Sequence, residues 1–407
     1  MKETSKEINK TDSFSIWVLV IIRAFRNFAA GLVNVAFPYF VLTELRGSSL
    51  LLGSLYAAAT IGTALIGLFV GISTDRSPKR TLLVSLALLP ISTTILVLYP
   101  GSIALVFVAA IVGGISATGS LASGGVGGYV QPVQSTVIAR VTARRDRTFY
   151  YGLLSFLAGV TSAFGALFAG FPTIGDSLIL ATIAGIASAV PALFLKLPKQ
   201  PSQRTTNESR FHLKSGNIIG KFGITGMVNG FANGLVLPFL IPFFYYSYGI
   251  GIEEMRIFAT LSGLVGSFAL LLAPRLEAQL GFLKGVIFSR GSAAILALIF
   301  PFVHLLPVSL AIYFLLPPLR VIAFPVVQTA MTDMIDKGEL GKAFGINQSA
   351  RLTVTSPAEL FAGYEFNLAS YDIPFVTYAL VIGANLYLYS RFFAGYGKPK
   401  SLEPHLP

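Results

Sequence analysis

The sequence contains no cysteine, and only three of its 407 residues are histidine. Without cysteine, disulfide bonds, thiolate catalysis and zinc-thiolate sites are excluded, and the scattered histidines have no metal-ligand spacing. A Ser-His-Asp set and paired catalytic carboxylates are absent, and the glycine-rich stretch 124–128 lacks the lysine that a phosphate-binding loop requires. We therefore expect no enzyme activity, no catalytic residue, no metal and no cofactor.

Charged residues are also scarce. They make up 12% of the chain, against roughly 25% in soluble proteins, while 54% of the residues are hydrophobic. The formal net charge of +12 is carried by basic residues that stand singly between long apolar runs. This spacing is typical of membrane topology and not of a phosphate-binding face, so we expect a lipid bilayer and no nucleic acid as partner.

Apolar runs of about 20 residues, the length with which a helix crosses a bilayer, occur twelve times. We predict an all-α polytopic membrane protein in which each run is one transmembrane helix. The predicted spans are 14–42, 49–72, 80–99, 102–139, 149–171, 177–197, 216–246, 254–276, 283–303, 308–335, 342–366 and 374–394.

The distribution of the 30 lysines and arginines supports an even number of spans with both ends of the chain on the same side. Under this assignment only Arg46 and Arg256 fall in loops on the opposite side. Basic loops remain cytoplasmic, so we expect a multi-pass protein of the cell membrane with both termini in the cytoplasm. Four arginines are assigned to the interior of spans, namely Arg23, Arg26, Arg320 and Arg351.

An internal repeat divides the chain into two halves. Residues 28–33 (FAAGLV) recur as 231–236 (FANGLV), and weaker matches continue through each half. The polar stretch 198–215 near the middle lacks periodicity and is typical of a linker. We predict an N-terminal six-helix bundle (1–197), a cytoplasmic linker (198–215) and a C-terminal six-helix bundle (216–407).

The first half contains an insertion, 117–130, that the second half lacks. With it, span 102–139 is about twice as long as a bilayer core requires, so the helix must be interrupted. Irregular backbone at membrane depth needs protein or water around it, and this segment is therefore expected to face a central cavity and to offer backbone amides to a substrate. The alternative is a surface loop.

A charged turn, 71–80 (GISTDRSPKR), joins the second and third spans. Its residues resemble the loop motif of the major facilitator superfamily, with proline where the family usually has glycine. The matching residues are Gly71, Asp75, Arg76, Lys79 and Arg80. The alternative is an ordinary basic cytoplasmic loop in which the aspartate has no special role.

The resemblance implies the major facilitator fold, two pseudo-symmetric bundles of six helices with a substrate held between them near mid-membrane. It also implies that the charged turn latches the two halves together on the cytoplasmic side. Spans 1, 4, 7 and 10 line the cavity in this family, and spans 3, 6, 9 and 12, which we expect to carry no deep charge, form the scaffold. The family's antiporter signature is not met, so the resemblance does not give the coupling mode.

Buried arginines indicate what the cavity binds. Arg26, Arg320 and Arg351 are expected near mid-depth, where a charge must face water or a partner. A guanidinium stays charged and binds carboxylate or phosphate in a bidentate way, so we predict an anionic solute. The alternative is structural, with Arg320 and Arg351 paired to Glu359 or Asp333.

Amides on neighbouring helices complete the predicted site, although amides between helices also act as simple interhelical contacts. Arg23 either joins this region or extends to the membrane surface. The predicted substrate-binding residues are Arg26, Asn27, Asn34, Gln134, Asn229, Asn233, Arg320, Gln328 and Arg351. The predicted coupling or gating residues are Gly71, Asp75, Arg76, Lys79, Arg80 and Glu359.

Together these features predict a secondary active transporter, a monomer that moves a small organic anion or phosphate-bearing compound by alternating access. Coupling would be to protons, through Glu359 or Asp75, or by exchange of one anion for another. A proton-coupled multidrug exporter is one alternative, although such exporters commonly have a deep acid where this chain has Arg26. A non-transporting membrane sensor or lipid-handling protein on the same fold is the other.

Overall fold

The computed structural model describes residues 12–116, 126–130, 133–134, 137–138, 147–195, 215–335 and 340–395. Within these ranges the chain forms helices and turns, with no strand. The helices in chain order are α1 (Ser13–Tyr39), η2 (Phe40–Glu44), α2 (Ser49–Arg76), α3 (Pro78–Leu98), α4 (Ile103–Gly113), η4 (Gly128–Val130), α6 (Arg147–Leu167), α7 (Ile174–Leu193), α8 (Gly216–Val236), η5 (Leu237–Phe239), α9 (Leu240–Tyr248), α10 (Ile252–Leu270), α11 (Ala273–Ile299), η6 (Phe300–Phe302), α12 (Leu306–Met334), α13 (Leu340–Asn367) and α14 (Asp372–Phe393).

Twelve helical segments within the described ranges correspond to the twelve predicted spans. α1 continues through η2, α8 continues through η5 into α9, and α11 continues through η6. Eight of these segments are long and apolar enough to cross a membrane by themselves. The other four are α4 and α6, which are shorter, α10, which begins with acidic residues, and α13. The predicted fold class is confirmed.

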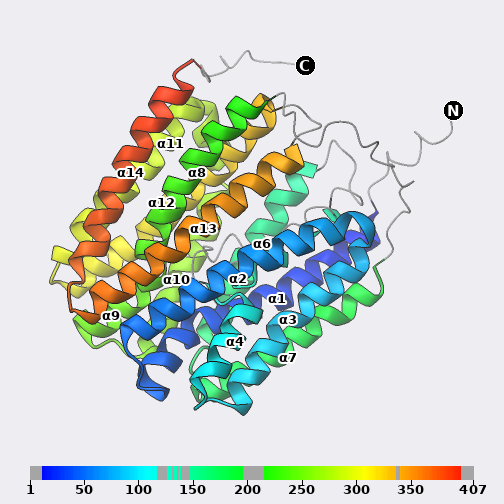
Figure 1. Cartoon of the computed structure of the whole chain (residues 1–407), viewed down its shortest axis with the longest axis vertical. Helices are drawn as coiled ribbons and strands as arrows, with labels where there is room; N and C mark the ends of the chain where they lie inside the picture. The colour runs from blue at the N-terminus through cyan, green and yellow to red at the C-terminus, as the bar shows by residue number, and fades with distance from the viewer. Residues whose placement is uncertain are drawn as a thin grey trace.

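The helices form two groups of six (Figure 1). In the N-terminal group α1 packs against α6 and α7, and α3 packs against α4 and α7. In the C-terminal group α8 packs against α13 and α14, and α11 packs against α12 and α14. The two groups meet along two antiparallel pairs, α2 with α13 and α6 with α10. The linker proposed between them, 198–215, lies outside the described residues except for Ser215, so the domain boundaries stay a prediction.

The repeated glycines make equivalent contacts in the two groups. A Cβ atom on Gly31 of α1 would overlap the backbone of Ser162 in α6, and one on Gly234 of α8 would lie 2.5 Å from the carbonyl oxygen of Thr355 in α13. Each glycine therefore lets the first helix of its bundle approach the fifth at backbone distance. The sequence repeat thus reflects a repeated helix packing.

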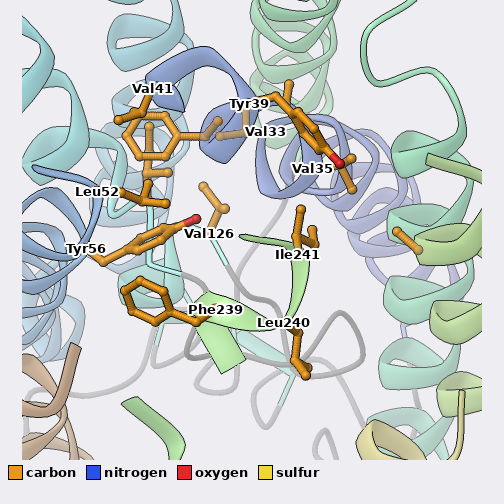
Figure 2. Packing of buried hydrophobic residues seen from close by; sticks show 14 of the residues in the cluster. Val33, Val35, Tyr39, Val41, Leu52, Tyr56, Val126, Phe239, Leu240 and Ile241 are labelled. Atoms are coloured by element: carbon orange, nitrogen blue, oxygen red, sulfur yellow. The ribbon is translucent and has the colours of Figure 1, made fainter. Parts of the chain in front are cut away.

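The ends of the molecule differ in how the two groups are joined. We call the end that carries Ser13 and Phe393 the terminal end, and the opposite one the far end. At the far end one hydrophobic cluster contains residues of both groups, among them Val33, Tyr56 and Phe239. Figure 2 shows these residues, with the ring of Tyr56 beside that of Phe239 at 6.4 Å between centroids.

At the terminal end the hydrophobic clusters stay separate. One contains only N-terminal residues, such as Leu19 and Leu82, and another only C-terminal residues, such as Phe222 and Phe393. Among the described residues, the buried hydrophobic clusters join the two groups at the far end and not at the terminal end, and nearer the terminal end one ring contact, Phe156 of α6 with Phe268 of α10, links them. We therefore call this conformation sealed at the far end.

Hydrogen bonds reinforce the far-end contact. The hydroxyl of Tyr39 donates to the carbonyl oxygen of Ile250 at 2.8 Å, and Ser49 donates to the hydroxyl of Tyr246 at 2.8 Å. Both bonds join the N-terminal group to the C-terminal one. They fix the relative position of the two groups beyond what non-directional apolar burial provides.

The α2–α13 contact is made by backbone atoms. A Cβ atom on Gly53 would lie 2.8 Å from both the Cα atom of Gly363 and the carbonyl oxygen of Glu359. One turn further, Ser356 donates a hydrogen bond to the carbonyl oxygen of Ala57 at 3.0 Å. No larger residue fits at Gly53 while the far end is sealed.

We therefore expect Gly53→Val to open the far end. The chain has no cysteine, so Ile241→Cys, at a buried position of the far-end cluster, provides a unique thiol. In detergent, its rate of reaction with a water-soluble maleimide should rise about tenfold or more in the Gly53→Val background, because overpacking costs roughly 1–3 kcal/mol.

Gly67→Val is the matched control, since a Cβ atom on Gly67, also in α2, has nothing within 4 Å. Gel filtration checks that all variants remain folded. Equal labelling in the two backgrounds would contradict a seal that depends on Gly53.

Candidate functional site

Arg26 of α1 is almost fully buried, with 5% of its surface exposed. Its Nη2 atom donates to the carbonyl oxygen of Val126 at 2.8 Å and to that of Gly127. The acceptors belong to the glycine-rich insertion that follows α4. The guanidinium is thus satisfied by backbone of its own bundle in this conformation, and its predicted contact with substrate stays a prediction.

The break in the fourth span is confirmed. α4 ends at Gly113, and Gly114 has a φ of 57°, the left-handed conformation that glycine adopts without strain. The chain returns at Gly127, whose φ is 73° and whose amide donates to the carbonyl oxygen of Gly114 at 2.9 Å. Two left-handed glycines are therefore joined directly by a hydrogen bond.

The described part of the insertion lies inside the protein. Val126, Tyr129 and Val130 are each 1% exposed, and the Tyr129 hydroxyl donates to the carbonyl oxygen of Val112 at 3.0 Å. We predicted that the segment faces a central cavity and offers backbone amides to a substrate. The amide of Gly127 is instead used within the chain, and it is carbonyl groups that point at a side chain. Residues 117–125 lie outside the described ranges.

Other predicted polar residues lie near Arg26 on the N-terminal side. Arg23 donates from Nε to Gln134 Oε1 at 3.1 Å, and Asn27 donates from Nδ2 to the carbonyl oxygen of Arg23 at 2.8 Å. Within the described residues, Asn27 Oδ1 and Gln134 Nε2 are buried without a hydrogen-bond partner. Arg23 therefore points into the bundle, and not to the membrane surface.

In the C-terminal group Arg320 of α12 and Arg351 of α13 are half-buried. Arg320 donates from Nη2 to Asn233 Oδ1 at 2.9 Å and also interacts with the side chain of Tyr378. Arg351 donates from Nη2 to Gln348 Oε1 at 2.9 Å. Asn233, one of the amides predicted to contact substrate, is thus bound to Arg320 in this conformation.

Sequence reasoning missed Arg290. It lies on α11, the ninth span, which was expected to carry no deep charge, and this expectation is wrong. Arg290 is 9% exposed, and its guanidinium carbon lies 5.0 Å from the ring centroid of Tyr389. The apolar part of α11 runs from Ala278 to Phe302, so Arg290 is near its middle.

A signal for this was present in the sequence. The predicted span began at residue 283, five residues later than the apolar segment, which placed Arg290 near its terminal-side end. The kink at Gly281, with a φ of 70°, joins two helical stretches of α11. A span boundary taken before this glycine would have placed Arg290 at mid-depth.

Among the described residues no ion pair joins Arg26, Arg290, Arg320 or Arg351 to a carboxylate. Asp333 is exposed. The alternative in which Arg320 and Arg351 pair with Glu359 or Asp333 is therefore not seen in this conformation. Their hydrogen-bond and ring partners in the described chain are neutral groups.

Glu359 lies elsewhere, in the contact between α13 and α2. It is fully buried, and neither carboxylate oxygen has a hydrogen-bond partner within the described residues. Tyr56 and Thr60 of α2 face it. The Thr60 hydroxyl, however, donates to Ser116 at 2.9 Å. An acid thus lies inside the far-end seal, apart from the arginines.

The charged turn is shorter than predicted. α2 extends to Arg76, only Ser77 is non-helical, and α3 begins at Pro78. Proline suits a first helical position because its fixed φ is helical and its missing N–H would be unpaired anyway. This explains why proline stands where the family has glycine.

Lys79 donates from Nζ to the carbonyl oxygen of Leu193, at the end of α7, at 2.6 Å. It therefore binds a free helix-end carbonyl of its own bundle. Arg80 is exposed. The side chains of Gly71, Asp75 and Arg76 are outside the described set, so a latch between the halves stays a prediction.

The remaining predicted amides are half-buried. Asn229 lies on α8 one turn before Asn233, Gln328 lies on α12 two turns after Arg320, and Asn34 lies on α1. No group of three potential metal ligands occurs in the part of the chain that the structure describes.

A family model described as the Major Facilitator Superfamily matches residues 19–356. No curated protein matches the sequence. Solved structures do match. A point mutant of the nucleoside transporter NupG has a TM-score of 0.73 at 12% identity, over 93% of this chain and 100% of that one.

Two further crystal structures are similar. A bacterial homologue of the human lysosomal transporter Spinster, inward-facing and occupied, has a TM-score of 0.72 at 14% identity, over 94% of this chain and 97% of that one. The human organic anion transporter MFSD10 has a TM-score of 0.67 at 12% identity, over 92% and 99%. At these identities the likeness shows the fold.

The contact between Arg26 and the insertion predicts a stability difference between two adjacent glycines. Gly127→Ala should destabilise the protein by roughly 1–3 kcal/mol, because a left-handed φ strains alanine. Its Cβ atom would also lie 2.8 Å from Arg26 Nη2. Thermal unfolding in detergent measures the change.

Gly128→Ala is the control, since its Cβ atom would have only a contact of 3.7 Å with Thr63. This variant should unfold near the wild-type temperature. An equal loss of stability in both variants would contradict the role assigned to Gly127.

Proposed function

Because this chain belongs to the major facilitator superfamily, we propose that it is a secondary active transporter of a small organic anion or phosphate-bearing compound in the cell membrane. The two bundles expose the substrate site to one side of the membrane and then to the other. Family membership and the fold account for transport of a small solute. The anionic nature of that solute is the proposal.

One observation supports an anionic solute. Arg320 and Arg351, half-buried on helices that cross the membrane, have amides and a phenol as partners and no carboxylate among the described residues. A charge at membrane depth costs several kcal/mol unless water or a counter-ion compensates it. An anionic solute supplies the missing charge and bidentate acceptors.

The sealed far end indicates toward which side of the membrane this conformation is open. Basic residues gather in the turns and ends at the terminal end, as in cytoplasmic loops. A chain that is joined at the far end and separate at the terminal end then corresponds to an inward-open state. Its likeness to a transporter structure described as inward-facing agrees with this assignment.

Glu359 supports proton coupling. Within the described residues Glu359 has no cation beside it, only the hydroxyl groups of Tyr56 and Thr60. A buried carboxylate is costly in such surroundings, whereas a protonated carboxyl is tolerated there. Opening the far end exposes Glu359 to water on the outer side, where an inward proton gradient favours its protonation, and the far end then reseals over a neutral carboxyl. Uptake of the anion is thereby linked to loading of a proton from outside.

The first test is transport by variants of Arg320. In proteoliposomes, Arg320→Gln should lower the uptake of an anionic substrate, identified from a panel of carboxylates and phosphate esters, by about tenfold or more, because a hydrogen bond to a charged group contributes about 1.5–3 kcal/mol. Arg391→Gln, on an exposed position in the last turn of α14, is the matched control.

Unchanged uptake in Arg320→Gln would contradict the anionic substrate. Uptake of organic cations in place of anions would favour the multidrug exporter. A complete lack of flux across the panel in folded wild-type protein would favour a sensor or lipid-handling role.

The second test concerns coupling. Glu359→Gln should abolish accumulation driven by a pH gradient and retain exchange of labelled for unlabelled anion, because glutamine mimics the protonated acid and cannot release a proton. Ser356→Ala, on the same contact with α2, serves as control and should retain both activities. Gradient-driven accumulation that survives Glu359→Gln would exclude this residue as the coupling site.

A further inference from the structure

Arg290 and Arg320 belong to one cluster. The side chain of Ser289 on α11 donates a hydrogen bond to the carbonyl oxygen of Leu319 on α12. Each of these two residues directly precedes one of the arginines. The bond therefore holds the backbones that carry Arg290 and Arg320 against each other.

Arg351 of α13 lies near Arg320 because both α13 and Arg320 contact α8. A Cβ atom on Gly230 would overlap the backbone and Cγ of Arg351, so α13 touches α8 at this glycine. Asn233, one helical turn (about 5 Å) along α8, is the acceptor for Arg320. The charges of Arg290 and Arg320 lie close enough to Arg351 to act on it.

No acidic side chain in the described chain neutralises the cluster. Its partners are the ring of Tyr389, the side chain of Tyr378 and the amides of Asn233 and Gln348. Arg290 and Arg320 each keep a buried Nη1 atom without a hydrogen-bond partner. Three like charges held together with unused donors are unfavourable until an anion binds.

We propose that Arg290, Arg320 and Arg351 together bind a doubly charged tetrahedral oxyanion, the phosphoryl group of a phosphate monoester or inorganic phosphate. A carboxylate offers two oxygens and one charge, which a single guanidinium fork satisfies. A phosphoryl dianion offers three oxygens and nearly two charges, which fits three donors from three helices. Arg290 is the residue that selects for the second charge.

The assignment rests on the proposed transport function and narrows its substrate class. It places the anion in the C-terminal bundle alone. Arg26 is not part of this site, because its Nη2 atom already donates to two carbonyl groups of the N-terminal bundle. The site is therefore asymmetric, although the two bundles share one packing pattern.

Methyl phosphate and dimethyl phosphate test the proposal. They share the tetrahedral centre, and at a pH above the second ionisation of a phosphate monoester they differ by one charge and one methyl group. Equilibrium binding of each to the purified full-length protein is measured by calorimetry for wild type, Arg290→Gln, Arg290→Lys and the exposed control Arg391→Gln. Inorganic phosphate is a third probe that lacks any organic part.

Wild type and Arg391→Gln should bind methyl phosphate about tenfold or more tightly than dimethyl phosphate. Arg290→Gln should bring this ratio close to one while the affinity for dimethyl phosphate is retained, and Arg290→Lys should restore part of it. Inorganic phosphate should show the same dependence on Arg290.

The proposal is overturned if wild type does not prefer the dianion, if neither ester binds, or if Arg290→Gln weakens both esters equally. The last result would indicate a structural role for Arg290. Arg320-dependent uptake of a monocarboxylate, without any dianion preference, would leave the transport function standing and reject this site. Absence of all anion flux and binding would reject both.

Discussion

A guanidinium group that leaves water needs acceptors or an anion, and this requirement shapes both bundles. In the N-terminal bundle the chain itself meets it. The fourth span breaks after Gly113, and the returning segment directs two carbonyl groups at Arg26. That arrangement requires a broken helix. A break inside the membrane is stable only where surrounding protein satisfies the free backbone groups.

The C-terminal bundle meets the same requirement differently. Its fourth helix, α12, runs from Leu306 to Met334 without such a break, and Arg320 depends on an amide and a tyrosine. Arg290 and Arg351 on neighbouring helices likewise have no acidic partner among the described residues. Two halves with one packing pattern thus differ in electrostatics: backbone carbonyl groups satisfy the arginine of one, and the arginines of the other have no anionic partner among the described residues. Duplication fixed the helix contacts, whereas the polar groups diverged.

Much of the architecture was predictable because its signals are long or repeated. Twelve apolar runs and the position of basic residues define the spans, and the repeat at Gly31 and Gly234 marks a conserved helix approach. Arg320 and Arg351 were identified because each lies well inside its predicted span. The interruption of the fourth span followed from its length alone.

What could not be predicted depends on local backbone geometry. Arg290 was misplaced because the predicted span began after Gly281; the apolar run reaches back to Ala278, but the run alone does not show that the helix kinks at this glycine. The insertion was expected to present amides, but the left-handed conformations of Gly114 and Gly127 turn carbonyl groups toward Arg26. A few backbone dihedral angles decide where a helix kinks and which way a carbonyl group points, and amino-acid composition does not specify these angles.

The contact of Gly53 with Gly363 has a mechanical consequence. Where two helices touch through main-chain atoms, no interlocked side chains have to change rotamer before one helix tilts over the other. Tilting of α2 over α13 therefore meets little steric resistance from side chains. Motion between the halves then concentrates at this point, while the interior of each half travels as a rigid body.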